Sequence, residues 1–199
     1  MQSNLRTELG IGNLLLMYVG NLESYQGIDL LLESFALSVR QTDKADLVII
    51  GGAAADIEKY QQKAQGLGIQ KSVHFLGPKP IEHLGMYLSQ ADMLMSPRIK
   101  GKNTPMKLYS YLDSGKALLA TNLQTHTQVL DKQIAMLTAP NAEAFSEGML
   151  RLIEDQNLRL RLGNAGKKLI EKRHTFAVFR QNLNSLYDWI QAELVEKTA

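Results

Sequence analysis

Short apolar runs that end near glycine or proline alternate with helical segments, and this alternation constrains the fold of the chain most strongly. The runs at 14–19 and 46–50 are continuously apolar or nearly so, as in strands buried on both faces. Four further runs complete a set of six expected strands: 73–77, 91–96, 117–120 and 134–138. Strands that alternate with helices predict an α/β fold, here a doubly wound, six-stranded parallel sheet with helices on both faces.

Apolar residues recur at helical spacing between the expected strands. The expected helices cover 28–40, 54–65, 81–88, 104–115 and 123–130. In the fourth of these, Thr104 suits the N-cap, Pro105 the first helical position and Gly115 the C-terminal stop. After Pro140 the pattern is helical to the end, which predicts a C-terminal helical tail.

Length and charge narrow the class of protein. The 199 residues suit one domain, which we place at 12–199, with 1–11 as a linker or the remnant of an upstream region. A net charge of +2 lacks the basic excess typical of nucleic-acid binding, so we expect no nucleic-acid partner. The longest apolar run, 14–19, is far below the roughly 20 residues of a membrane helix, and the first six residues lack the apolar core of a signal peptide. We therefore expect a cytoplasmic protein with no transmembrane segment.

The cofactor motifs most often found on this fold are missing. Gly10 and Gly12 precede the first strand, and Leu15 stands where the third glycine of a dinucleotide fingerprint would be. Asn103 stands where a P-loop needs serine or threonine. The chain has no cysteine, no Asp-x-Asp pair and no two histidines at metal-ligand spacing. We expect no metal and no bound cofactor.

The segment 100–104 is the part of the chain best suited to an anion. Lys100 and Lys102 carry charge, and Lys107 lies in the first turn of the following helix, whose free N–H groups and dipole favour negative charge. The competing interpretation is an ordinary solvated loop. His126 opens another helix at the same sheet edge, where a capping, surface position is the favoured interpretation.

The ordered set of loop motifs resembles the C-terminal domain of family 4 retaining glycosyltransferases, enzymes with two facing Rossmann-like domains (the GT-B fold). The resemblance runs from about residue 12 to 190. Its motifs are YVGNL (18–22), QGIDLL (26–31), IIGG (49–52), VHFLG (73–77), SP (96–97), PMKLY (105–109) and GKA (115–117). It implies that this domain binds a nucleotide-diphosphate sugar without a metal, that an N-terminal domain of the same enzyme binds the acceptor, and that the full-length enzyme can be peripheral to a membrane.

The resemblance also implies where the donor lies. The diphosphate is expected at the loop that follows the first strand, and the base near Gly77. The expected donor-binding residues are Gly20, Asn21, Gln26, Gly77, Lys79, Gly101, Lys102, Asn103, Thr104, Lys107 and Ser110. No catalytic side chain is assigned, because such enzymes rely on the donor phosphate and on groups from the other domain.

Four positions depart from the family pattern. Asn21 replaces an arginine, Gln26 replaces a lysine, and Lys102 and Ser110 replace two glutamates. The two cations that would neutralise a diphosphate are therefore missing from the first loop.

Three interpretations follow from these departures. Lys79, Lys102 or Lys107 compensates for the missing cations; the domain is a non-catalytic binding or scaffold module; or it is half of a nucleotide-sugar epimerase. If a donor binds, the sequence predicts its anion at the N-terminus of the helix that starts at Pro105, near Lys102 and Lys107.

Overall fold

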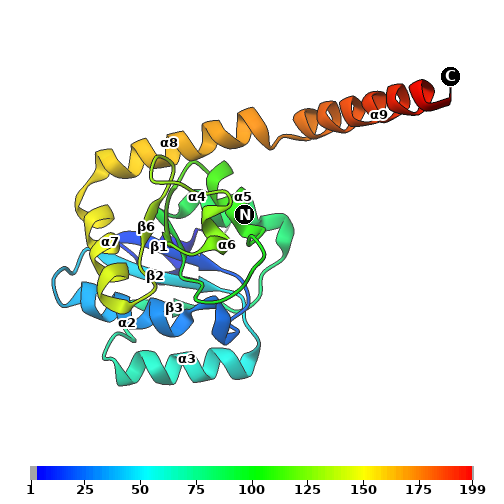
Figure 1. The fold of residues 1–199 in the computed structure, drawn as a ribbon. Helices are drawn as coiled ribbons and strands as arrows, with labels where there is room; N and C mark the ends of the chain where they lie inside the picture. The colour runs from blue at the N-terminus through cyan, green and yellow to red at the C-terminus, as the bar shows by residue number, and fades with distance from the viewer. Residues whose placement is uncertain (1–3, 199) are drawn as a thin grey trace.

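The structure, a computed structural model, describes residues 4–198 and has the predicted α/β architecture (Figure 1). Its six strands are all parallel and form one sheet of order β3-β2-β1-β4-β5-β6. The strands are β1 (Leu14–Val19), β2 (Ala45–Ile50), β3 (Val73–Phe75), β4 (Met93–Ser96), β5 (Ala117–Thr121) and β6 (Met136–Thr138). The strand order reverses between β1 and β4, the switch point at which sheets of this kind bind ligands.

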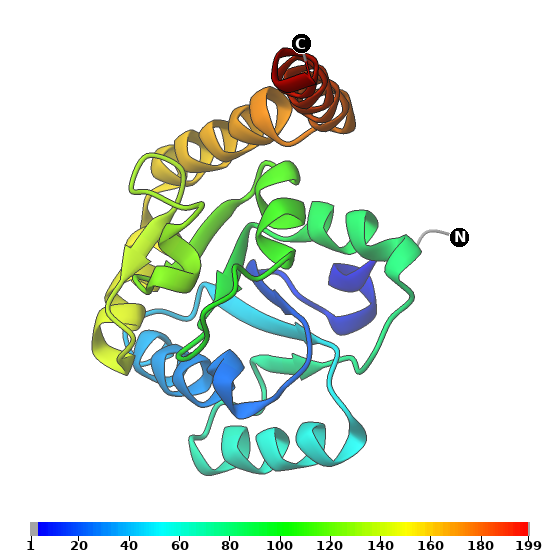
Figure 2. The same ribbon diagram turned by 45° about the vertical axis from the view of Figure 1, so that its right-hand side comes forward.

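Helices cover both faces of the sheet. They are α1 (Leu5–Leu9), α2 (Ile28–Val39), α3 (Ala54–Gly66), α4 (Leu84–Gln90), α5 (Lys107–Asp113), α6 (Gln124–Thr127), α7 (Ala142–Glu154), α8 (Gln156–Arg173) and α9 (Phe176–Thr198), with short 3-10 turns at Ser24–Gln26 and Ile81–His83. Figures 1 and 2 show α2 and α3 on one side of the sheet and α4 and α5 on the other. The layers are those of a doubly wound fold.

The two faces of the sheet bury different residues of the same strands. In β1, Leu16 and Tyr18 join the cluster under α2, α3 and α7, whereas Leu15 and Met17 join the cluster under α1, α4 and α5. Successive side chains of a strand point to opposite faces, so a strand covered on both sides needs apolar residues at every position. This explains the continuous apolar run that the sequence shows.

Helix α5 begins later than predicted. It starts at Lys107 rather than Pro105, and the Thr104 hydroxyl donates to Gln128 Oε1 at 2.6 Å. The predicted N-cap is wrong because the later start places Met106, which has no capping side chain, at the N-cap position. The predicted end is confirmed: Gly115 follows the helix with φ of +70°.

The described part of the segment predicted as a linker packs on the domain. Asn4 caps α1 by accepting from the backbone N–H of Thr7 at 3.2 Å, and Leu5 and Ile11 are buried in the cluster beneath α4 and α5. Arg6 forms an ion pair with Asp92. Residues 4–11 are thus part of the folded unit.

Helix α9 extends from the end of α8 away from the sheet (Figure 1). Its large apolar side chains are exposed; besides Leu194 they are Phe176, Phe179, Leu183, Leu186, Tyr187, Trp189 and Ile190. We call these seven residues the α9 stripe. Within residues 4–198, no helix is both long and apolar enough to cross a membrane.

Candidate functional site

The switch point between the carboxyl ends of β1 and β4, called the crevice below, is where sheets of this kind bind ligands. The two strands pair at only two positions, of which Met17 with Leu94 is the later. Beyond it, the Tyr111 hydroxyl from α5 accepts from the Val19 N–H at 2.7 Å and donates to the Val19 carbonyl at 3.2 Å. The hydroxyl satisfies backbone groups that β4 does not reach, which keeps the strands apart at the switch point.

The loops after β1 and β4 are joined at the crevice. The backbone N–H of Ile99 donates to the Tyr25 carbonyl at 3.0 Å, and the Arg98 guanidinium lies 5.1 Å from the centre of the Tyr25 ring. Gly27, with φ of +77°, approaches so closely that an added Cβ would lie 2.0 Å from the Pro97 carbonyl oxygen. The two loops therefore form one packed unit.

Gly20 makes a narrow turn directly after β1. Its φ is +152°, and an added Cβ would lie 3.0 Å from the Tyr18 hydroxyl and 2.9 Å from Lys107 Nζ. The Tyr18 hydroxyl donates to the Asn21 carbonyl at 2.6 Å, which closes the turn. Burial raises the pKa of Tyr18, so this donor stays protonated. The backbone of Gly20 carries no side chain that would hinder the approach of a ligand.

Lys107 reaches from the first residue of α5 to this turn. Its ammonium lies 4.0 Å from the centre of the Tyr18 ring. The Nζ atom is buried and has no hydrogen-bond partner among the described residues. Burial, with a smaller contribution from the charge of Arg98, lowers the pKa of Lys107 to about 7. The structure thus brings two of the predicted donor-binding residues, Gly20 and Lys107, into contact.

The rest of the predicted anion-binding segment, 100–104, is held by hydrogen bonds from Arg98 and Gln128. Arg98 donates to the carbonyls of Lys100 at 2.7 Å and Asn103 at 3.3 Å, and the Gln128 amide donates to the Lys102 carbonyl at 3.1 Å. The side chains of Lys100 and Lys102 are exposed. Arg98 also packs closely against Gly101, where an added Cβ would lie 2.3 Å from the guanidinium.

His126 is buried, so its predicted surface position is wrong. Its Nδ1 lies 2.8 Å from the Thr121 carbonyl, which only accepts, so Nδ1 carries the proton and Nε2 accepts from the Ser96 hydroxyl at 2.8 Å. Burial lowers the pKa of His126 to about 4. The neutral imidazole therefore joins the ends of β4 and β5 below the loop that begins at Pro97.

The other predicted residues lie in different surroundings. Gln26 is buried with no partner for its Oε1 among the described residues, and Lys79 is exposed. The Gly77 carbonyl accepts from the Gly51 N–H at 2.8 Å, which links the loops after β2 and β3. Ser110 lines a hollow of about 440 Å³ between α4, α5 and α8.

Sequence reasoning missed the aromatic and arginine side chains that shape the site. Tyr18, Tyr25, Arg98 and Tyr111 hold the crevice loops, yet only Tyr18 lies in a motif singled out from the sequence. A tyrosine at the end of an apolar strand is the sequence signal that could have indicated such a residue, because a buried tyrosine hydroxyl needs a hydrogen-bond partner.

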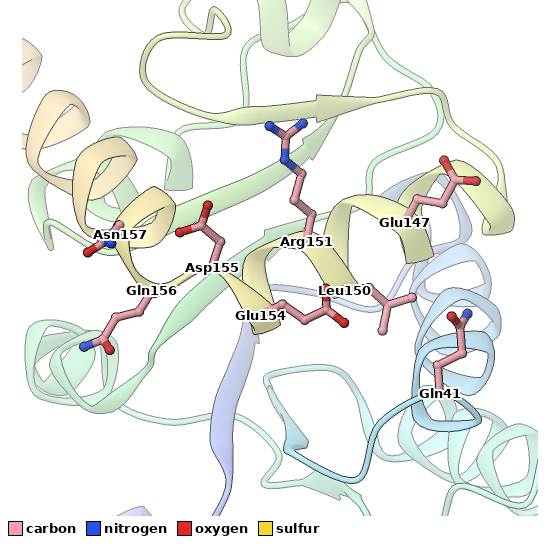
Figure 3. Close-up of a pocket in the computed structure, with 8 residues that line it drawn as sticks. All are labelled: Gln41, Glu147, Leu150, Arg151, Glu154, Asp155, Gln156 and Asn157. Atoms are coloured by element: carbon pink, nitrogen blue, oxygen red, sulfur yellow. The ribbon is translucent and has the colours of Figure 1, made fainter.

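A hollow beside α7 lies at the other end of the strands. Its volume is about 640 Å³, and it is lined by Gln41, Glu147, Leu150, Arg151, Glu154, Asp155, Gln156 and Asn157. Figure 3 shows these side chains coming from α7, the turn into α8 and the segment after α2, with Arg151 pointing away from Leu150 and Gln41. The ends of α2 and α7 lie at the amino edge of the strands, and the lining holds three carboxylates and one arginine. Neither the position nor the charge suits a diphosphate.

Comparison with known proteins defines the class. The family described as glycosyl transferases group 1 matches residues 2–169. The chain belongs to this family.

Two curated relatives illustrate the breadth of the match. D-inositol 3-phosphate glycosyltransferase of Corynebacterium glutamicum is 25% identical over 193 residues, covering 92% of this chain and 46% of that protein. An uncharacterized glycosyltransferase of Methanocaldococcus jannaschii is 23% identical over 159 residues, covering 79% of this chain and 40% of that protein. The chain spans less than half the length of these relatives.

Solved structures confirm the fold. HepE from Anabaena, in complex with UDP-glucose, matches with a TM-score of 0.82 at 16% identity, covering 92% of this chain and 51% of that one. Sucrose-phosphate synthase from Thermosynechococcus elongatus matches with a TM-score of 0.81 at 20% identity, covering 94% and 48%. The Rossmann-like α/β domain of GT-B glycosyltransferases is therefore the fold of this chain.

Proposed function

We propose that this domain binds the nucleotide-diphosphate sugar donor of a retaining, metal-independent, family 4 glycosyltransferase, whose acceptor domain is a separate N-terminal unit of the same enzyme. The observation that carries the proposal is the Gly20 turn at the switch point, with its bare backbone and the unpartnered ammonium of Lys107 beside it. Family membership and the UDP-glucose bound to HepE support the same ligand class.

The two alternatives are less well supported. A scaffold module that had lost its ligand would have no reason to retain a buried, unpartnered lysine at the turn. An epimerase needs a free acid or base in the cleft, and His126, the one candidate histidine, has both ring nitrogens engaged. The donor-binding role agrees best with both observations.

Nucleotide binding tests the proposal directly. We expect this chain to bind UDP and UDP-glucose in isothermal titration calorimetry, and we expect Gly20→Ala to weaken UDP binding tenfold or more. The added Cβ would crowd Tyr18 and Lys107 at the turn, which a diphosphate must approach closely.

The matched control for this variant is Gly12→Ala. Gly12 precedes β1 at the opposite edge of the sheet, and an added Cβ there meets nothing within 4 Å. UDP affinity should be unchanged in that variant. Absence of UDP and UDP-glucose binding by the unaltered chain would refute the proposed function.

The α9 stripe supports the proposed acceptor domain as a partner. A row of seven exposed apolar side chains on a helix that leaves the domain is the kind of surface that a second domain covers. The chain also spans less than half of its relatives, which leaves room for such a domain in the full enzyme.

The single tryptophan of the chain, Trp189, reports on this contact. Its side chain is 60% exposed, so its fluorescence maximum in this chain should be that of a solvated indole. In an enzyme that includes the acceptor domain, we expect the Trp189 emission, taken as the difference from a Trp189→Phe variant, to shift to shorter wavelength. An identical emission maximum in both proteins would contradict the packing of α9 against that domain.

A further inference from the structure

Lys107 lies where it can replace the cations that are missing from the loop after β1. The family pattern has cations at 21 and 26, and the chain has Asn21 and Gln26 there. Lys107 comes from α5, on the other side of the crevice, and its ammonium lies against Gly20, directly before the first of those two positions in the sequence. The structure thus places a cation beside the same turn, but from a different element.

Nothing in the described chain compensates the Lys107 charge. None of the ion pairs among residues 4–198 includes Lys107, and its three N–H donors have no acceptor there. Its one favourable contact is with the face of the Tyr18 ring. A buried ammonium without an acceptor is unfavourable, so its retention at a ligand-binding turn indicates a partner that is not part of the chain.

The groups around Lys107 specify the charge of that partner. From β1, Tyr18 is neutral because its pKa is raised; from the loop after β4, Arg98 is positive; and from α6, His126 is neutral because its pKa is lowered. On the Gly20 side, Glu23 is exposed and lies 3.5 Å from the Asn21 amide. Apart from the exposed Glu23, the groups named around the ammonium are neutral or positive and suit an anion.

Lys102 and Lys107, which the sequence treats alike, differ in the structure. Lys102 is exposed, whereas the Nζ atom of Lys107 is buried against the turn. An exposed lysine is solvated and contributes little to the binding of an anion, whereas a desolvated ammonium forms a much stronger contact. The two lysines are consequently expected to contribute unequally.

We propose that Lys107 is the cation that binds the donor diphosphate at the Gly20 turn, and that its amine takes up one proton from solvent when the diphosphate binds. The inference rests on the proposed function. Burial holds the Lys107 pKa at about 7, so above neutral pH the free protein is largely unprotonated at this amine. An adjacent diphosphate favours the ammonium and raises this pKa, and the proton comes from the buffer.

The sign of the pH dependence follows. Below about pH 7 the ammonium is already present in the free protein, and binding takes up no proton there. Above it, uptake approaches one proton per ligand, and the affinity falls by up to tenfold for each pH unit until the pKa of the bound state is reached.

The experiment is calorimetric titration of this chain with UDP at pH 6.0, 7.5 and 8.5, each in two buffers of different ionisation enthalpy. Because the terminal phosphate of UDP also titrates near pH 6, the uptake is taken as the difference from Lys107→Met; we expect this difference to be small at pH 6.0 and near one proton at pH 8.5. Uridine, which has no phosphate, should bind without proton uptake. Lys107→Met should weaken UDP binding at least tenfold at pH 6.0 and leave uridine binding unchanged.

Two controls separate the possible results. Lys100→Met, at an exposed lysine of the loop before α5 that is not among the expected donor-binding residues, should change UDP affinity less than threefold and keep the uptake. Lys107→Met should also raise the Tm, because it replaces a buried amine with an apolar side chain, and a raised Tm shows that the variant folds. UDP binding by Lys107→Met within threefold of the unaltered chain, or undiminished proton uptake, would overturn this inference alone. Absence of UDP binding by the unaltered chain would overturn the proposed function with it.

Discussion

Replacing Gly27 with alanine should lower the free energy of unfolding by about 3 kcal/mol or more. Two effects add. The φ of +77° is unfavourable for any residue with a Cβ, and the new methyl group would lie 2.0 Å from the Pro97 carbonyl oxygen. The clash cannot be relieved by a side-chain movement, because the atom it meets belongs to the backbone.

The surroundings of Pro97 resist a backbone shift. The preceding Ser96 donates to His126, and the backbone N–H of Ile99 donates to the Tyr25 carbonyl at 3.0 Å. Moving the loop away from Gly27 would stretch both bonds. Urea unfolding at pH 7 measures the change, with the slope of the transition checked for constancy.

Gly68→Ala is the matched control. Gly68 has a φ of +73°, but an added Cβ there meets nothing within 4 Å, so the variant isolates the backbone strain of about 1–2 kcal/mol. If Gly27→Ala destabilises the protein no more than Gly68→Ala does, the loops after β1 and β4 are not held together as described.

Acidification should destabilise the protein through His126, by on the order of 3 kcal/mol between pH 6.5 and pH 4. The folded state holds this imidazole neutral and lowers its pKa from 6.5 to about 4. In that interval the unfolded chain binds the proton and the folded chain does not. The contribution to stability is therefore complete above pH 6.5 and is lost as the pH falls toward 4.

Urea unfolding at pH 7.0 and pH 4.5 tests this dependence. His126→Gln should be less stable at pH 7.0, because the bonds to Ser96 and Thr121 are altered, but its stability should fall less between the two pH values. His83→Gln, at an exposed histidine, should keep the full dependence. Lys107, with a pKa of about 7, titrates at the upper end of this interval, and its contribution is present in all three proteins and cancels in the comparison. An undiminished pH dependence in His126→Gln would contradict the assignment.

The class of fold could be predicted from the sequence because its signal is local. The continuous apolar run of β1 and the helical spacing of α2 each lie within one short segment, and a strand covered on both faces has few alternatives to a parallel sheet. Each loop motif is also a short segment, and the order of these motifs along the chain indicated the glycosyltransferase family. Both predictions are confirmed.

The site depended on contacts between segments far apart in the chain. The sequence placed Lys102 and Lys107 in one basic segment and His126 at the surface; the fold turned Lys107 to Gly20, left Lys102 in solvent and buried His126 between β4 and β5. Local patterns determine secondary structure and which faces are buried. Whether a single ammonium or imidazole is buried depends on which neighbours the parallel sheet brings to its carboxyl edge. At that edge, the separation of β1 from β4 determines the neighbours of Lys107. This separation is a property of the strand order and not of any one segment, so only the tertiary structure shows it.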